Sequence, residues 1–341
     1  MGRLKLGLAL TAVVLGVVML QPAAAGAQAG DDQARVLVFS KTAAFRHGSI
    51  PVGRTAIQNL GQQHGFQVET TEDAAQFTDA NLARFDAVIW LSTTGDVLND
   101  EQQAAFERYI RADGGYVGVH AAADTEYTWP WYGQLVGAYF RNHPNGTPTA
   151  TVVVEDATHR STAHLPARWT RVDEWYNYQS PVNPVVGGGG EDYSPRNTEG
   201  VHVLLTMDES TYNEADGSDG VDDDHPIAWC HRYDGGRAWY TGLGHTEASY
   251  EDPAFLGHLL GGLEVASGYA PDPACGALET SAEGGISGTG PPTLSLTLGA
   301  PASFGTFLPG VSQEYLASTN AMVVSTAPSA ELSVRDPSFT F

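Results

Sequence analysis

The sequence is short of cysteine and of basic residues, and both shortages limit what the protein can be. It has two cysteines, Cys230 and Cys275, and no C-x-x-C pair, which argues against a structural zinc finger. In an oxidising compartment the two cysteines either form one disulfide, or Cys230 is buried and Cys275 is a free, exposed thiol. Lysine and arginine number 17 against 40 acids, a formal net charge of -23. Such a surface repels phosphate, so we expect no nucleic acid partner and no anionic lipid surface.

Long apolar runs are also scarce. The one of note, Leu6 to Leu20, follows Arg3 and Lys5 and precedes two A-x-A motifs that end by Ala29. Its length suits the hydrophobic part of a signal sequence and is short for a membrane span. We therefore expect residues 1–29 to be a signal peptide and the mature chain to be secreted or held at the cell surface, with no membrane contact after cleavage. An uncleaved membrane anchor is the alternative.

What the sequence does contain is an alternation of apolar runs with amphipathic segments. Continuous apolar runs indicate strands that are buried on both faces of a sheet. The strands expected in the first part of the chain are 35–40, 66–70, 87–91 and 116–119. Helices are expected between them, one beginning near Ser49 and one at Asn99, where Gln102 completes a capping box. This βαβ order predicts an α/β fold with a doubly wound, mostly parallel sheet.

The later part of the chain is less regular. We expect a short helix at 134–140 and a closing helix at 253–266, with further strands at 151–155, 201–206, 227–231 and 237–241. The main domain is thus expected at residues 30–268. Residues 269–292 are rich in Gly, Pro, Ser and Ala and read as a linker. Residues 293–341 alternate as strands do and suggest an incomplete β-rich, Ig-like segment. The alternative is that these strands pack on the main domain.

Histidines follow several of the predicted strands. His47 comes after the first strand, His120 after the fourth and His245 after a late one, with His143 in between. Ligands bind at the carboxyl ends of strands in open α/β sheets, so we expect His120 and His245 to line one pocket. His120 can act there as general acid or base, assisted by Asp124, Glu174 and His245 as the other catalytic residues.

A metal ion is the other use for such a cluster. His47, His120 and His245 are the candidate ligands, and imidazoles with a carboxylate suit a divalent ion such as Zn²⁺. No H-E-x-x-H spacing supports the site, so no cofactor is certain from the sequence. Other catalytic classes lack their motifs, because there is no G-x-S-x-G elbow and neither cysteine follows a strand in a way that suits a nucleophile.

Aromatic residues around these positions point to a carbohydrate ligand. Aromatic rings stack on the C–H faces of sugars, while polar side chains bond the hydroxyls. The expected substrate-binding residues are Arg46, His47, Glu126, Tyr127, Trp129, Trp131, His143, Tyr176 and His225. For any single aromatic residue a place in the core is the simpler expectation.

Several long motifs together resemble the trehalose-utilisation (ThuA-like) family. They are VLVFSKTAAFRHGSIP, GGYVGVHAAADTEYTWPWYGQLVGAYFRNHP, DEWYNY, HPIAWCHRYDGGRAWYTGLGHT and the closing helix with His258. The resemblance covers about residues 35–268. It implies a flavodoxin-like sheet akin to class I glutamine amidotransferase domains, with His120 where those domains hold a cysteine. Thiol-based glutamine hydrolysis is therefore not expected.

The family is linked to disaccharide catabolism, including sugars oxidised to keto forms. The resemblance implies a secreted protein that breaks down glycosides or keto-glycosides by hydrolysis or elimination. Two other functions stay open at this point. One is a non-catalytic carbohydrate-binding module at the cell surface, and the other is a metal-dependent hydrolase of a non-sugar substrate.

Overall fold

The computed structural model describes residues 33–212, 224–270 and Cys275, together with two strands nearer the C-terminus. The chain forms two compact units, Met1–Cys275 and Gly276–Phe341. In the second unit, β12 (Leu294–Leu298) and β13 (Ala321–Ser325) pair antiparallel. The expected signal peptide lies outside the described residues, and so does almost all of the expected linker. The domain boundaries and the Ig-like assignment stay predictions.

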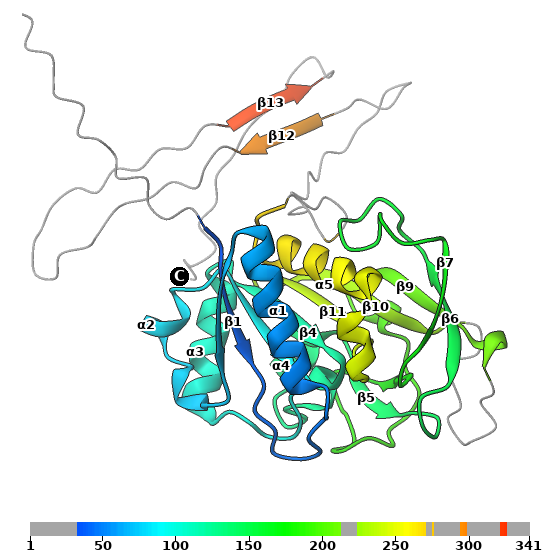
Figure 1. Cartoon of the computed structure of the whole chain (residues 1–341). Helices are drawn as coiled ribbons and strands as arrows, with labels where there is room; N and C mark the ends of the chain where they lie inside the picture. Colours follow the sequence, from blue (N-terminus) through cyan, green and yellow to red (C-terminus); the bar gives the residue numbers. More distant parts are fainter. Residues whose placement is uncertain (1–32, 213–223, 271–274, 276–293, 299–320, 326–341) are drawn as a thin grey trace, which may run out of the picture. The chain divides into compact units, whose positions relative to one another are not determined.

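A nine-stranded sheet forms the centre of the first unit (Figure 1). Its strands lie in the order β2-β1-β3-β4-β11-β10-β9-β6-β7. In that order the bounds are Gln67–Thr71, Arg35–Phe39, Ala87–Leu91, Gly115–Val119, Gly236–Thr241, Pro226–Tyr233, His202–Asp208, Thr149–Val154 and Arg168–Val172. The first five strands are mutually parallel, which gives the flavodoxin-like order 2-1-3-4 with β11 as the fifth strand.

Helices cover both faces of the parallel strands, as the sequence predicts. In the described part of the chain the α-helices are α1 (Ile50–His64), α2 (Asp79–Leu82), α3 (Asp100–Arg111), α4 (Pro130–Val136) and α5 (Pro253–Ala266). Alternate residues of one strand enter two separate cores, since Leu37 and Phe39 pack with α3 while Val36 and Val38 pack with α1 and α5. This double burial is why the strands are apolar throughout, and it confirms the doubly wound α/β prediction.

The capping box before α3 is present as expected. The Asn99 side chain accepts the N–H of Gln102, and the Gln102 side chain accepts the N–H of Asn99, at 3.0 Å each. One helix prediction was partly wrong. The expected helix at 134–140 is α4, which begins at Pro130 and ends at Val136, because Gly137 follows in the left-handed region with φ 94°. Tyr139 to Asn142 instead form β5, which pairs with β8 (Asn177–Gln179) in a small separate sheet.

Four strands extend the sheet beyond β11 by antiparallel pairing. Because strand direction reverses at each of these four pairings, β10 and β6 run opposite to the parallel strands, whereas β9 and β7 run in the same direction as them. The strand β7 therefore ends at the same edge as β4 and β11, and the chain that follows β7 begins with Asp173 and Glu174. The topology thus carries a pair of acids from a distant strand to the edge that bears the histidines.

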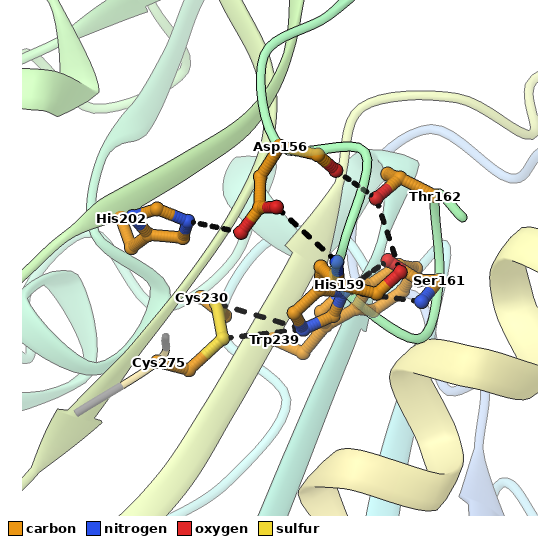
Figure 2. Close-up of a disulfide and its surroundings, with 8 residues drawn as sticks. All are labelled: Asp156, His159, Ser161, Thr162, His202, Cys230, Trp239 and Cys275. Atoms are coloured by element: carbon orange, nitrogen blue, oxygen red, sulfur yellow. Dashed lines mark hydrogen bonds and ion pairs between the residues drawn. A yellow bond between two sulfur atoms is a disulfide. The ribbon is translucent and has the colours of Figure 1, made fainter. Parts of the chain in front are cut away.

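The two cysteines form a disulfide between β10 and the chain after α5 (Figure 2). Their Cα atoms are 5.2 Å apart, within the usual range for a bridge. His159 contacts both sulfurs, with its Nε2 3.3 Å from Cys275 Sγ. Of the two alternatives that the sequence leaves open, the structure shows the disulfide. Among the described residues, no helix is both long and apolar enough to cross a membrane.

Candidate active site

Four predicted side chains meet at the carboxyl edge of the sheet. His47 lies in the loop after β1, His120 follows β4, Glu174 follows β7 and His245 follows β11. Each offers one ligand-type atom, and these four atoms lie within 4.8 Å of one another. Three of the four residues are buried, and the His245 side chain is partly exposed. We call these four residues the histidine–glutamate cluster.

His120 occupies a strained turn between strand and helix. Its φ of 51° lies in the left-handed region, which is uncommon for a residue with a side chain. The short 3₁₀ helix His120–Asp124 begins at this residue. A sharp strand-to-helix turn of this kind projects a side chain from the top of an α/β sheet. The ring is held by a hydrogen bond from Nδ1 to the carbonyl of Gly242, at 2.8 Å.

Glu174 is the centre of the cluster. Its Oε2 lies 3.2 Å from His120 Nε2 and 2.9 Å from His245 Nδ1. Those two imidazole nitrogens are 3.1 Å from each other. His143, which the sequence also predicts for this site, lies on the other side of the carboxylate with its Nδ1 3.4 Å from Oε1.

The cluster shifts the proton affinities of its members. Burial lowers the pKa of His47 to about 2, and the imidazoles of His120 and His245 add to the effect. Burial raises the pKa of Glu174, but the neighbouring imidazoles of His120 and His245 outweigh it and hold that pKa below its usual value. Burial lowers the pKa of His245, yet contact with Glu174 gives a net rise. The cluster therefore combines a carboxylate, Glu174, with one imidazole that resists protonation, His47.

Asp124 lies at the other end of the short 3₁₀ helix that begins at His120, and its environment differs from that of the cluster. Burial raises its pKa, and the hydroxyl of Tyr127, which donates to Oδ1 at 2.6 Å, only partly opposes the rise. The same hydroxyl also contacts the carbonyl of Phe140 at 3.2 Å. A half-buried carboxyl with a raised pKa holds its proton more tightly than a free carboxyl does, as a general acid requires.

Aromatic rings border the cluster. The ring of Tyr176 lies 4.3 Å from that of His120, and Phe140 packs on Tyr176 at 4.4 Å. Phe45 contacts His47 edge-on at 4.9 Å, and 65% of its surface is exposed. Arg46 lies between Phe45 and His47 in sequence. Its guanidinium forms an exposed ion pair with Glu72 at 2.8 Å. An exposed aromatic ring beside buried polar groups is a surface on which a sugar ring can stack.

Four further predicted substrate-binding residues are engaged elsewhere. Glu126 is fully buried and accepts the N–H groups of Val97 and Leu98, at 2.8 Å each. Trp129 donates to Glu107, and Trp131 donates to Asp234 in the turn that precedes β11, at the end of that strand opposite to His245.

The fourth is His225, which lies behind the site. Its Nε2 bonds the carbonyl of Tyr176 at 2.8 Å and its Nδ1 faces Glu209 at 2.9 Å. It therefore supports the backbone that carries Tyr176. The structure does not bring Glu126, Trp129, Trp131 or His225 into contact with the histidine–glutamate cluster.

Two residues in this region were missed by sequence reasoning. Phe45 lies within the quoted loop motif but carries no signal that separates it from a core aromatic. Asp173 is fully buried and accepts the N–H groups of Gly244 and His245, at 3.0 and 2.9 Å. The adjacent acids at a strand end, Asp173 and Glu174, were the available signal for it.

Comparison with known proteins gives one family and a group of related folds. The family model described as "ThuA: Trehalose utilisation" matches residues 35–266. A ThuA-like protein from Bacteroides uniformis is 23% identical, with 72% of this chain and 94% of that chain covered and a TM-score of 0.54. A ThuA-like protein from Parabacteroides merdae is 19% identical, covers 69% and 90%, and has a TM-score of 0.52. The glutaminase domain of Trypanosoma brucei CTPS is 9% identical, covers 70% and 96%, and has a TM-score of 0.39. No curated protein matches the chain.

Proposed function

This chain belongs to the trehalose-utilisation (ThuA) family, and on that premise we propose that it breaks down glycosides or keto-glycosides at the histidine–glutamate cluster. The observation that carries the proposal is the meeting of His120, Glu174 and His245 beside Asp124, at the edge where α/β sheets bind ligands. The cluster and Asp124 differ in proton affinity, as the two partners of an acid–base pair must.

Asp124 is the proposed proton donor. As the glycosidic C–O bond breaks, its carboxyl proton passes to the leaving oxygen, and the carboxylate that remains is stabilised by the hydroxyl of Tyr127. In hydrolysis, a water then adds to the sugar carbon and its proton passes to the cluster. In a keto-glycoside, the cluster can instead remove the proton next to the carbonyl, which leads to elimination of the same leaving oxygen.

The proposed acceptor of that proton is the cluster around His120. The Nδ1–H of His120 is held by Gly242, so Nε2 carries the lone pair and faces Glu174. This tautomer is the one that a general base requires. It supports the acid/base role expected for His120, with Glu174 and His245 as its partners.

The exposed ring of Phe45 and the rings of Tyr176 and Phe140 support a carbohydrate as the substrate. The disulfide supports an oxidising compartment, as proposed for a secreted or surface protein. Figure 2 shows the bridge beside His159 and Ser161 of the main domain, and both of these residues are buried.

The test is turnover of disaccharides and of their chemically oxidised keto forms, with products followed by mass spectrometry. We expect release of a monosaccharide or an unsaturated sugar, and loss of about 100-fold or more in kcat for Asp124→Asn and Glu174→Gln. The matched control is Glu101→Gln, because Glu101 is exposed at the start of α3.

Each other outcome points elsewhere. Saturable glycan binding without product, in every buffer, would indicate a binding module. Turnover of a non-sugar ester or amide, without turnover of glycosides, would indicate a hydrolase of another class.

A further inference from the structure

The histidine–glutamate cluster has more hydrogen-bond acceptors than donors. His120 gives its Nδ1–H to Gly242, so a neutral ring presents only a lone pair at Nε2. That lone pair faces Glu174 Oε2, which is also an acceptor, at 3.2 Å. His245 can offer a single proton at Nδ1, so it can donate to His120 Nε2 or to Glu174 Oε2 but not fully to both. A buried contact between two acceptors is unfavourable unless a positive charge lies between them.

His47 adds a further unsatisfied atom. Its side chain is buried, and its Nδ1 has no hydrogen-bond partner. The ring packs edge-on against those of His120 and His245, at 4.8 and 5.1 Å between centroids. Buried polar atoms of native proteins are almost always paired, so the unpaired nitrogen of His47 and the surplus acceptors of the cluster together favour a cation as their partner.

We propose that the cluster binds one divalent transition-metal ion, with His47, His120, Glu174 and His245 as its ligands. This inference rests on the proposed function, since it concerns the same site, and it changes one role there, because His120 would hold the ion instead of accepting the proton. The short separations around Glu174, from 2.9 to 3.2 Å, are slightly below the roughly 3.4 Å between ligands that follows from metal bonds of about 2.1 Å in tetrahedral geometry.

The ligand types select the kind of ion. Three imidazoles and one carboxylate suit zinc and its neighbours in the first transition row, whereas Mg²⁺ and Ca²⁺ prefer oxygen ligands. The hydrogen bond from His120 to Gly242 is the type of outer contact that orients a ligating imidazole. Zn²⁺ is therefore the first ion to test. Bound there, it would polarise a water or a carbonyl oxygen and take the place of His120 as the activating group.

A second group of potential ligands does not support another site. His159, Cys230 and Cys275 lie together, but both sulfurs are in the disulfide and are not thiolates. The N–H of Ser161 also donates to Nδ1 of His159 at 3.1 Å, so the proton of that ring is on Nε2, which faces the sulfurs. That nitrogen has no free lone pair for an ion.

The test is metal binding by the full chain. Elemental analysis after dialysis against Zn²⁺, and competition with a chromophoric chelator, should give one ion per chain. Co²⁺ bound at the cluster should give the visible absorption bands of a tetrahedral site with nitrogen ligands. Glu174→Gln and His245→Ala should weaken Zn²⁺ binding by about 100-fold or more, because the first removes the carboxylate charge and the second removes an imidazole ligand. His64→Ala is the control, since His64 is exposed at the end of α1.

The inference is overturned if no ion binds stoichiometrically, or if both ligand variants bind Zn²⁺ as the unchanged chain does. Circular dichroism shows whether each variant is folded, and His245→Ala, at a partly exposed residue, is the less disruptive of the two. Turnover of sugars by the metal-free protein would support the proposed function and show that it needs no metal ion. Stoichiometric Zn²⁺ binding without turnover of any sugar would support the metal site and contradict the proposed function.

Discussion

Asp173 accepts the backbone N–H of His245 at 2.9 Å while directly preceding Glu174 in the chain. Its second oxygen accepts the N–H of Gly244, whose φ of 106° suits glycine, and a guanidinium N–H of Arg171 at 2.9 Å. One fully buried carboxylate therefore fixes two of the four cluster residues relative to each other. Hydrogen bonds from charged donors and backbone amides make such a link strong.

Replacement Asp173→Asn should disturb this link, because an amide nitrogen would then face backbone N–H groups. We expect a loss of about 1–3 kcal/mol in the free energy of unfolding. We also expect a 10- to 100-fold loss in metal affinity or kcat. Asp79→Asn, at an exposed ion pair with Arg108, is the control. A variant that is less stable but unchanged in kcat and metal affinity would show that Asp173 does not position the site.

Tyr127→Phe should change the pH profile of turnover. The hydroxyl of Tyr127 stabilises the Asp124 carboxylate, so its removal raises the pKa of Asp124 further. If Asp124 donates a proton, the alkaline limb of kcat/KM moves to higher pH in this variant. The same limb disappears in Asp124→Asn. A limb that stays in place in Tyr127→Phe would contradict the role of Asp124 as the acid.

Phe45→Ala should weaken substrate binding more than it slows the reaction. The exposed ring of Phe45 contacts the site at His47, and its backbone carbonyl, which accepts from Thr94 at 2.7 Å, is untouched by the change. Losing one stacking surface should raise KM about tenfold with kcat little changed. Phe45→Trp should retain binding. An unchanged KM in Phe45→Ala would place the sugar elsewhere.

The disulfide should stabilise the main domain by about 2–4 kcal/mol, because it closes a loop of 45 residues. Cys230→Ala, Cys275→Ala and the double variant should then lower Tm by similar amounts, since any of them breaks the same bond. Dithiothreitol should lower the Tm of the unchanged chain and leave that of the double variant alone. If the Tm losses of the two single variants add up in the double variant, the change in Tm reports side-chain packing and not the disulfide bond.

His258 should make the domain sensitive to acid. Burial lowers its pKa to about 3, and its ring links the carbonyl of Ser161 to the hydroxyl of Thr241. Since its unfolded pKa is near 6.5, the unfolded chain binds the proton more tightly. The stability that neutral His258 provides is complete above about pH 6.5 and falls toward pH 3, by about 1.4 kcal/mol per pH unit.

The measurement is the free energy of unfolding by urea across that pH range. His258→Gln should show a smaller pH slope than the unchanged chain, while His64→Gln, at an exposed position, should not. Equal slopes in all three proteins would mean that His258 is not buried as a neutral ring.

Local patterns predicted most elements of the first unit. The strand at 87–91, the helix at 253–266 and the capping box of Asn99 and Gln102 lie where the sequence places them, because each depends on neighbouring residues alone. The helix expected at 134–140 was displaced because Pro130 starts α4 early and Gly137 ends it. Apolar periodicity does not fix such boundaries.

The amino-acid sequence by itself determined which residues could bear chemistry. His47, His120 and His245 follow predicted strands, and parallel strands end at one edge, so their meeting was foreseeable. The family resemblance also came from sequence motifs. Glu174 was also predicted at the site, but its route there was not, since it reaches the histidines through four antiparallel steps from β11 to β7.

Tertiary structure decided which predicted residues share the site. Trp131 is near His120 in sequence, yet it bonds Asp234 before β11, while Asp173 is distant in sequence and holds His245. The physical reason is that strand order and direction decide which side chains meet across a sheet. These depend on the packing of the whole core, whereas periodicity and caps depend only on neighbouring residues.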